Sequence, residues 1–75
     1  MKTSKILASQ VGIGHNIEVD FRNDVRENKD VRRYTDKMRV YYVDKLENDL
    51  IKFTDNTGFT YVVKADLEIK IFNRR

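Results

Sequence analysis

One short segment of this chain combines side chains that bind phosphate with side chains that stack on bases. Four cations and two tyrosines lie within residues 32–41: Arg32, Arg33, Tyr34, Lys37, Arg39 and Tyr41. Arginine and lysine neutralise phosphate groups and aromatic rings stack on bases, and proteins that bind single strands use both. The segment therefore indicates a basic and aromatic surface of the kind that binds nucleic acid.

The charge around this surface is mixed in sign. Residues 22–39 hold seven Lys/Arg and four Asp/Glu, whereas the remaining 57 residues hold eight of each, so the net charge of +3 lies in this one segment. Acidic side chains repel phosphates, and interleaved charges are typical of a solvated loop or of the rim of a protein interface. The mixed charge favours a protein partner and leaves a nucleic acid open.

The other candidate sites are weak. Residues 12–15 read Gly-Ile-Gly-His, but a phosphate loop needs a helix after the glycines, and the residues that follow alternate like a strand. His15 is the single histidine, the carboxylates are dispersed along the chain, and cysteine is absent. These features predict a non-enzymatic protein with no catalytic residue, no metal site and no cofactor.

The length of 75 residues allows one domain, expected to span residues 1–75. No apolar run approaches the roughly 20 residues of a membrane helix, and residues 1–14 do not resemble a signal peptide. We therefore expect no membrane association and a cytoplasmic location. A core this small is marginal, so a homodimer stays open.

The clearest local structure is a β-hairpin over residues 50–63. Two runs rich in β-forming residues flank Asp55-Asn56-Thr57-Gly58, whose Asp and Gly suit a tight turn closed by a left-handed glycine. The register that follows pairs position 53 with 61 and position 51 with 63. One face then collects Ile51, Phe53, Tyr61 and Val63.

Further strands are expected over residues 17–21, 38–43 and 68–72. Alternation directs Ile17, Val19 and Phe21 inward on the first, Met38, Val40 and Tyr42 on the second, and Ile69 and Ile71 on the last. Residues 22–36 form a long charged loop, 44–48 a polar connection and 64–67 a single helical turn. For the N-terminus we favour a strand over residues 7–13, with a short helix over 4–11 as the alternative.

This order of elements resembles that of an SH3-like small barrel. The resemblance covers residues 16–72 and implies an all-β fold, a five- or six-stranded antiparallel barrel in which residues 22–36 form the long first loop. Tryptophan and proline are absent, so the binding of proline-rich peptides is not implied. Another small open barrel is the main alternative.

Alternation also assigns five apolar residues to the outer side of these strands: Tyr41, Val43, Leu50, Val62 and Phe72. An apolar patch on a small domain marks a protein interface, unless the N-terminal segment covers it. We therefore predict a protein-binding module, a small stand-alone regulator or inhibitor of the kind that phages encode. Its partner would contact residues 32–41 together with Val43, Val62 and Phe72. The alternative is a barrel that binds nucleic acid through residues 32–41.

Overall fold

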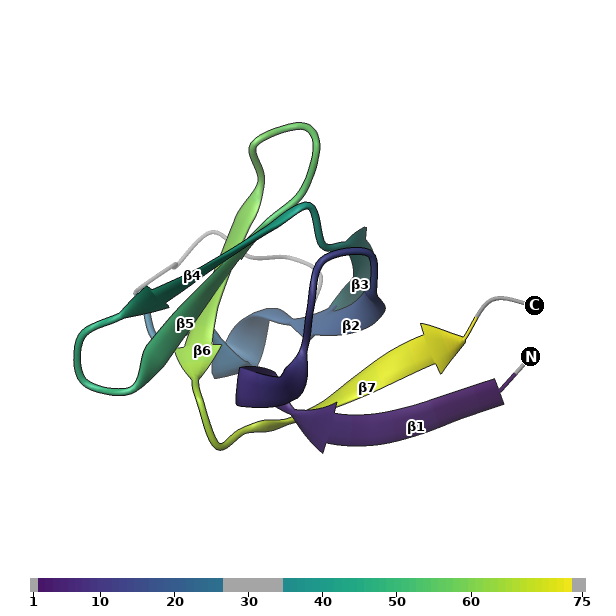
Figure 1. The fold of residues 1–75 in the computed structure, drawn as a ribbon, viewed down its shortest axis with the longest axis horizontal. Coiled ribbons are helices and arrows are strands. Elements are labelled where there is room, and N and C mark those ends of the chain that lie inside the picture. Colours follow the sequence, from purple (N-terminus) through teal and green to yellow (C-terminus); the bar gives the residue numbers. More distant parts are fainter. Residues whose placement is uncertain (1, 27–34, 74–75) are drawn as a thin grey trace.

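The described part of the chain folds into two antiparallel β-sheets (Figure 1). The computed structural model describes residues 2–26 and 35–73. Within these residues lie β1 (Lys2–Leu7), β2 (Asn16–Asp20), β3 (Thr35–Arg39), β4 (Tyr42–Leu46), β5 (Leu50–Thr54), β6 (Thr60–Lys64) and β7 (Glu68–Asn73). Two short 3-10 turns cover Ala8–Gln10 and Phe21–Asn23. The expected all-β class is confirmed.

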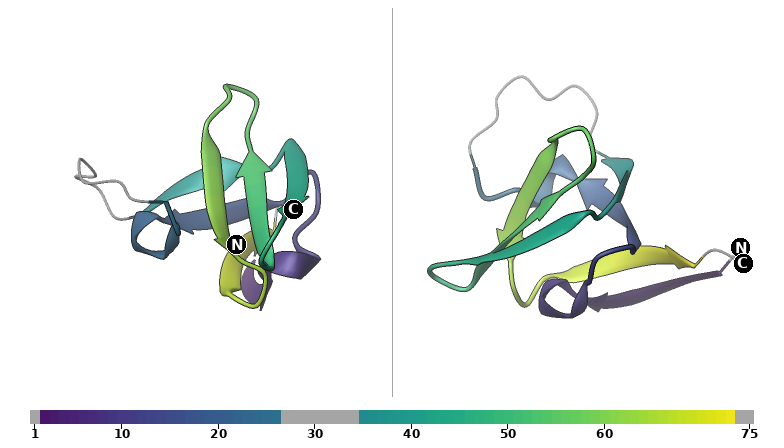
Figure 2. Two further views of the ribbon diagram at one scale, coloured as in Figure 1. Left: turned by 90° about the vertical axis from the view of Figure 1, so that its left-hand side faces the viewer. Right: turned by 45° about the horizontal axis from the view of Figure 1, so that its top comes forward.

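The strands form a four-stranded sheet in the order β1-β7-β2-β3 and a three-stranded sheet in the order β4-β5-β6. In the described part of the chain, no strand pairs across the two sheets. A closed barrel is therefore not shown, and the finer resemblance to an SH3-like barrel stays a prediction. Figures 1 and 2 show β1 and β7 side by side, as their register from Lys2↔Asn73 to Leu7↔Glu68 requires.

The β5–β6 hairpin has the predicted register. Phe53 pairs with Tyr61 and Ile51 with Val63, and all four are buried. Gly58 has a φ of 95°, which side chains with a Cβ rarely adopt. The Asp55 carboxylate accepts hydrogen bonds from the N–H groups of Thr57 (2.8 Å) and Phe59 (3.0 Å), so it fixes the turn. The hairpin was predictable because turn chemistry and alternation agree locally.

The N-terminus differs from its prediction. A strand is present, but it spans Lys2–Leu7 rather than 7–13, and the alternative helix is reduced to the 3-10 turn Ala8–Gln10. Ala8 and Val11 lie in the core, whereas Ile13 is 72% exposed. Among the described side chains of β1, Ile6 packs against the core, whereas Ser4, Lys5 and Leu7 are exposed. Main-chain pairing with β7 therefore accounts for most of the strand's attachment to the sheet.

The predicted strand 38–43 is two strands, and the break lies at residues 40–41. Val40 donates its N–H to the carbonyl of His15 (2.9 Å), whereas Tyr41 donates to Thr54 in the other sheet (2.8 Å). The chain thus passes between sheets, and the inward face shifts by one residue. Tyr42, expected inward, is 62% exposed, and Val43, expected outward, is half-buried against the core.

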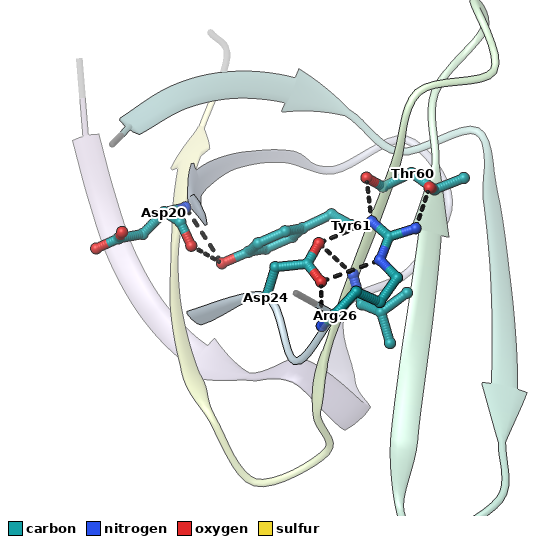
Figure 3. Close-up of polar contacts among 6 residues, drawn as sticks. Asp20, Asp24, Arg26, Thr60 and Tyr61 are labelled. Carbon is teal, nitrogen blue, oxygen red and sulfur yellow. Dashed lines mark hydrogen bonds and ion pairs between the residues drawn. The ribbon is translucent and has the colours of Figure 1, made fainter. Parts of the chain in front are cut away.

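Both sheets contribute to one core, which is joined at Tyr61. Its side chain is buried, and its hydroxyl donates to the carbonyl of Asp20 (3.0 Å) and accepts from the N–H of Asp20 (3.2 Å), as Figure 3 shows. Burial raises the pKa of this hydroxyl. β6 of one sheet is therefore tied to the end of β2 in the other. In the part of the chain that the structure describes, no helix is long and apolar enough to cross a membrane.

Candidate functional site

The structure places some of the predicted basic and aromatic residues and leaves others outside the described part of the chain. Arg32, Arg33 and Tyr34 lie outside the described residues. Lys37 and Arg39 lie on β3 with exposed side chains, as predicted, and Tyr41 is 40% exposed just after that strand. The long loop predicted over 22–36 is shorter at both ends, because Phe21–Asn23 form a 3-10 turn and β3 begins at Thr35.

The predicted outer apolar patch does not form. Val62 was predicted on the outer side but is buried, with 4% of its surface exposed. Val43 packs on the core, because the inward face shifts by one residue after Val40. Val62 is enclosed because residues 24–26 run along β6. Its carbonyl accepts from the N–H of Val25 (2.9 Å), and its own N–H donates to Asp24 (3.3 Å). Phe72 and Leu50 are half-buried.

A clasp of two charged residues holds that segment against β6 (Figure 3). The guanidinium of Arg26 donates to the Asp24 carboxylate (2.7 and 3.0 Å) and to the Thr60 carbonyl (2.9 Å) and hydroxyl (2.7 Å). Burial raises the pKa of Asp24, but the hydrogen bonds from Arg26 and Val62 outweigh burial, and the pKa lies below its ordinary value. The clasp fixes the chain immediately before residues 27–34.

The outer face of the four-stranded sheet gathers cations from three strands. Ile69, Ile71, Ile17 and Met38 are buried on the inner face. Because side chains alternate along a strand, the opposite face carries the neighbours of these residues. Its cations are Lys5 on β1, Lys70 on β7, and Lys37 and Arg39 on β3. We name the surface formed by these four residues and Phe72 the cationic face.

Lys5 and Lys70 stand directly opposite each other in the β1–β7 register. Cβ atoms of directly opposed residues lie about 4.5–5.5 Å apart, and like charges in such a pair destabilise a sheet. Lys5 is exposed and Lys70 half-buried. The pair concentrates positive charge at the cost of some stability.

Phe72 follows Lys70 by two residues on β7 and shares its face of the sheet. It pairs with Asn16 on β2, and Asn16 pairs with Arg39 on β3. The ammonium group of Lys37 lies 4.9 Å from the centroid of the Phe72 ring, within the range of a cation–π interaction. The Phe72 ring thus has Lys70 next to it along β7 and Lys37 over it from β3, whereas the positions directly opposite Phe72 are Thr3 and Asn16.

The acidic side chains on this face only partly offset the cations. Glu18 is directly opposite Lys37, and Glu68 is opposite Leu7. Asp20 is paired with Arg22 at 2.7 Å, and the hydrogen bonds from the Arg22 side chain lower the pKa of Asp20. With that ion pair neutral, four cations face two carboxylates. The surface therefore has a positive balance that favours anionic ligands.

Two open pockets in the described part of the chain include none of the five residues of the cationic face, although Glu68 on the same side of the sheet lines one of them. One of about 510 Å³ is lined by Arg22, Asn23, Val25, Lys64, Asp66, Leu67 and Glu68. The other, about 300 Å³, is lined by Asn48, Asp49, Lys64, Ala65 and Asp66. Charges of both signs line each of them. Among residues 2–26 and 35–73, no group of three His, Asp or Glu side chains could hold a metal ion.

Residues 12–15 have a structural role. The N–H of Gly12 donates to Nδ1 of His15 (2.9 Å), and Gly14, with a φ of 97°, donates to the carbonyl of Val40 (2.8 Å). The His15 side chain is half-buried rather than freely exposed. The glycines therefore shape a turn that leads into β2, and the imidazole of His15 caps this turn.

Sequence reasoning missed Lys5 and Lys70. Their alternation with Ile6, Ile69 and Ile71 was a signal that both point outward, but only the pairing of β1 with β7 brings them together. Phe72 was predicted as a contact residue, though as part of a different surface. No family model matches this chain, and no curated protein or solved structure matches it either.

Proposed function

We propose that this protein binds nucleic acid through the cationic face. The supporting observation is the opposed pair Lys5–Lys70 beside Phe72, whose ring is covered by Lys37. An anion placed between two like charges removes their repulsion, and phosphate groups are the ligands that clustered Lys and Arg neutralise. The proposed role is non-enzymatic. It corresponds to the alternative that the sequence left open, binding of nucleic acid, but the proposed binding site is centred on the four-stranded sheet rather than on residues 32–41.

The predicted protein partner stays a prediction, as does the role of a regulator or inhibitor. Tyr42 (62% exposed) and Leu46 (41% exposed) lie on β4, an edge of the three-stranded sheet. An edge strand can accept a strand from a partner. Pairing of β4 with a second copy, centred on Asp44, would place two Asp44 carboxylates opposite each other, so the edge is protected against this homodimer.

The proposal is tested by the anisotropy of labelled DNA and RNA oligomers at about 50 mM salt, where phosphate contacts are strong. Each phosphate contact on a single strand contributes about −0.7 to the slope of log affinity against log salt concentration. Lys37→Gln combined with Arg39→Gln should therefore make the slope about 1.4 less steep. The matched control, Lys45→Gln combined with Lys52→Gln, removes two cations from the three-stranded sheet.

We expect the control to keep the affinity and slope of the natural protein. Equal losses in both double variants would mean that overall charge, not the cationic face, drives binding. An absence of binding to every oligomer at low salt would refute the proposal. Capture of a protein from host extract after nuclease treatment would then support the protein-partner prediction instead.

A further inference from the structure

Phe72 gives the cationic face a feature that charge alone does not require. Its ring is half-buried, next to Asn16 and under the ammonium group of Lys37. An aromatic ring makes no favourable contact with a phosphate backbone. A base stacks on such a ring, and the gain in binding free energy depends little on which base it is. The ring therefore bears on which form of nucleic acid the face fits.

We infer that the cationic face selects single-stranded nucleic acid and stacks one base on Phe72. This inference rests on the function proposed above. Bases in a duplex are paired and stacked on one another, so a ring on a sheet surface reaches only an unstacked base. Entry of the sheet into a duplex groove is also unfavourable. Four strands span about 14 Å from first to last, whereas the major groove is about 12 Å wide.

The positions around Phe72 indicate how the strand would lie. Lys70 lies two residues before Phe72 on β7, with Lys5 opposite it on β1, and Lys37 and Arg39 lie on β3. A strand that crosses the sheet from β1 towards β3 would bring one phosphate to each pair, with the intervening base on the ring. Lys37 then moves from the ring to a phosphate. Asn16, whose amide offers two donors and an acceptor, is placed to meet the edge of that base.

Replacement of the ring separates stacking from charge. Phe72→Leu keeps an apolar side chain and every cation, and Phe72→Tyr keeps the ring. Stacking on one residue contributes enough that its loss weakens binding about 5- to 150-fold. We expect that loss for Phe72→Leu with a single strand of about 16 nucleotides. Phe72→Tyr should bind within about twofold of the natural protein, and the weaker binding of a duplex should be unchanged by either substitution.

A second measurement reports stacking of the base directly. A single strand can carry one fluorescent adenine analogue whose emission falls when the analogue stacks on a ring. Binding of the natural protein should quench this emission, whereas Phe72→Leu at saturating concentration should not. Equal affinity for strand and duplex, with no quenching, would overturn the inference and leave the proposed function intact. An absence of binding to both would refute the proposed function itself. Thermal melts of each variant establish that it is folded.

Discussion

Replacement of Lys5 by glutamate should stabilise the fold and weaken binding at the same time. In the natural chain Lys5 faces Lys70 directly across the β1–β7 ladder. Opposite-charge pairs in this position contribute about 0.2–1 kcal/mol, and like charges destabilise. Turning repulsion into attraction should raise the unfolding free energy by about 0.5 kcal/mol. For a domain of this size, that corresponds to a rise in Tm of roughly 2–4 °C.

The same substitution would remove the phosphate contact that we propose for Lys5. If the contribution of one contact vanishes near 1 M salt, its loss lowers affinity about 8-fold at about 50 mM salt. The new carboxylate repels phosphates, so this figure is a lower bound. Thermal melts and oligomer anisotropy on one protein preparation measure both effects. High salt should reduce both, because both act between exposed charges.

A matched control is Lys45→Glu, which changes the net charge by the same amount. Lys45 is exposed on β4 and pairs with Ile51, so no lysine opposes it. We expect its Tm and its affinity to stay near those of the natural protein. A Lys5→Glu variant that is less stable, or that binds as well as the natural protein, would refute the reasoning about this face.

Three further substitutions and one control test the contacts that hold the fold together. Tyr61→Phe leaves the Asp20 N–H and carbonyl without their shared partner, so urea unfolding should show a loss of about 1–3 kcal/mol. Asp24→Asn should lose about 1.5–3 kcal/mol at neutral pH, because its hydrogen bonds are charge-assisted. The pKa of Asp24 is lowered by folding, so its stabilisation is full above the unfolded value of about 3.9 and is lost as pH falls below it. Unfolding at pH values on both sides of about 3.9 should therefore show the gap between Asp24→Asn and the natural protein narrowing in acid. Val62 is 4% exposed, so Val62→Glu should unfold the protein, as measured by circular dichroism. The control Tyr42→Glu changes a surface residue and should leave the thermal melt unchanged.

The sequence predicts what is decided locally. The β5–β6 hairpin follows from Asp55, Gly58 and alternation in residues close along the chain, and its register was correct. The break at residues 40–41 could not be predicted in this way. Val40 and Tyr41 both suit a strand, and only their hydrogen bonds to His15 and Thr54 show that they serve different sheets.

The candidate site illustrates the same limit. Lys37 and Arg39 were predicted because they lie in a conspicuous basic segment, and both are exposed on β3. Lys5 and Lys70 are 65 positions apart in the chain and are brought together only by the pairing of the first and last strands. The burial of Val62 likewise depends on residues 24–26, whose place beside β6 is fixed by the Asp24–Arg26 clasp.

The two faces of the four-stranded sheet follow different rules. At the centre of the inner face, opposed side chains fill the core, as Ile17 opposite Met38 shows. On the outer face, folding alone would favour opposite charges across each pair, as at Glu18 and Lys37. Lys5 opposite Lys70 departs from that rule in the ladder that holds both ends of the domain together. A single Lys-to-Glu change would relieve the repulsion, so the stability of the fold does not account for the pair, and the proposed binding of phosphate offers a reason for it.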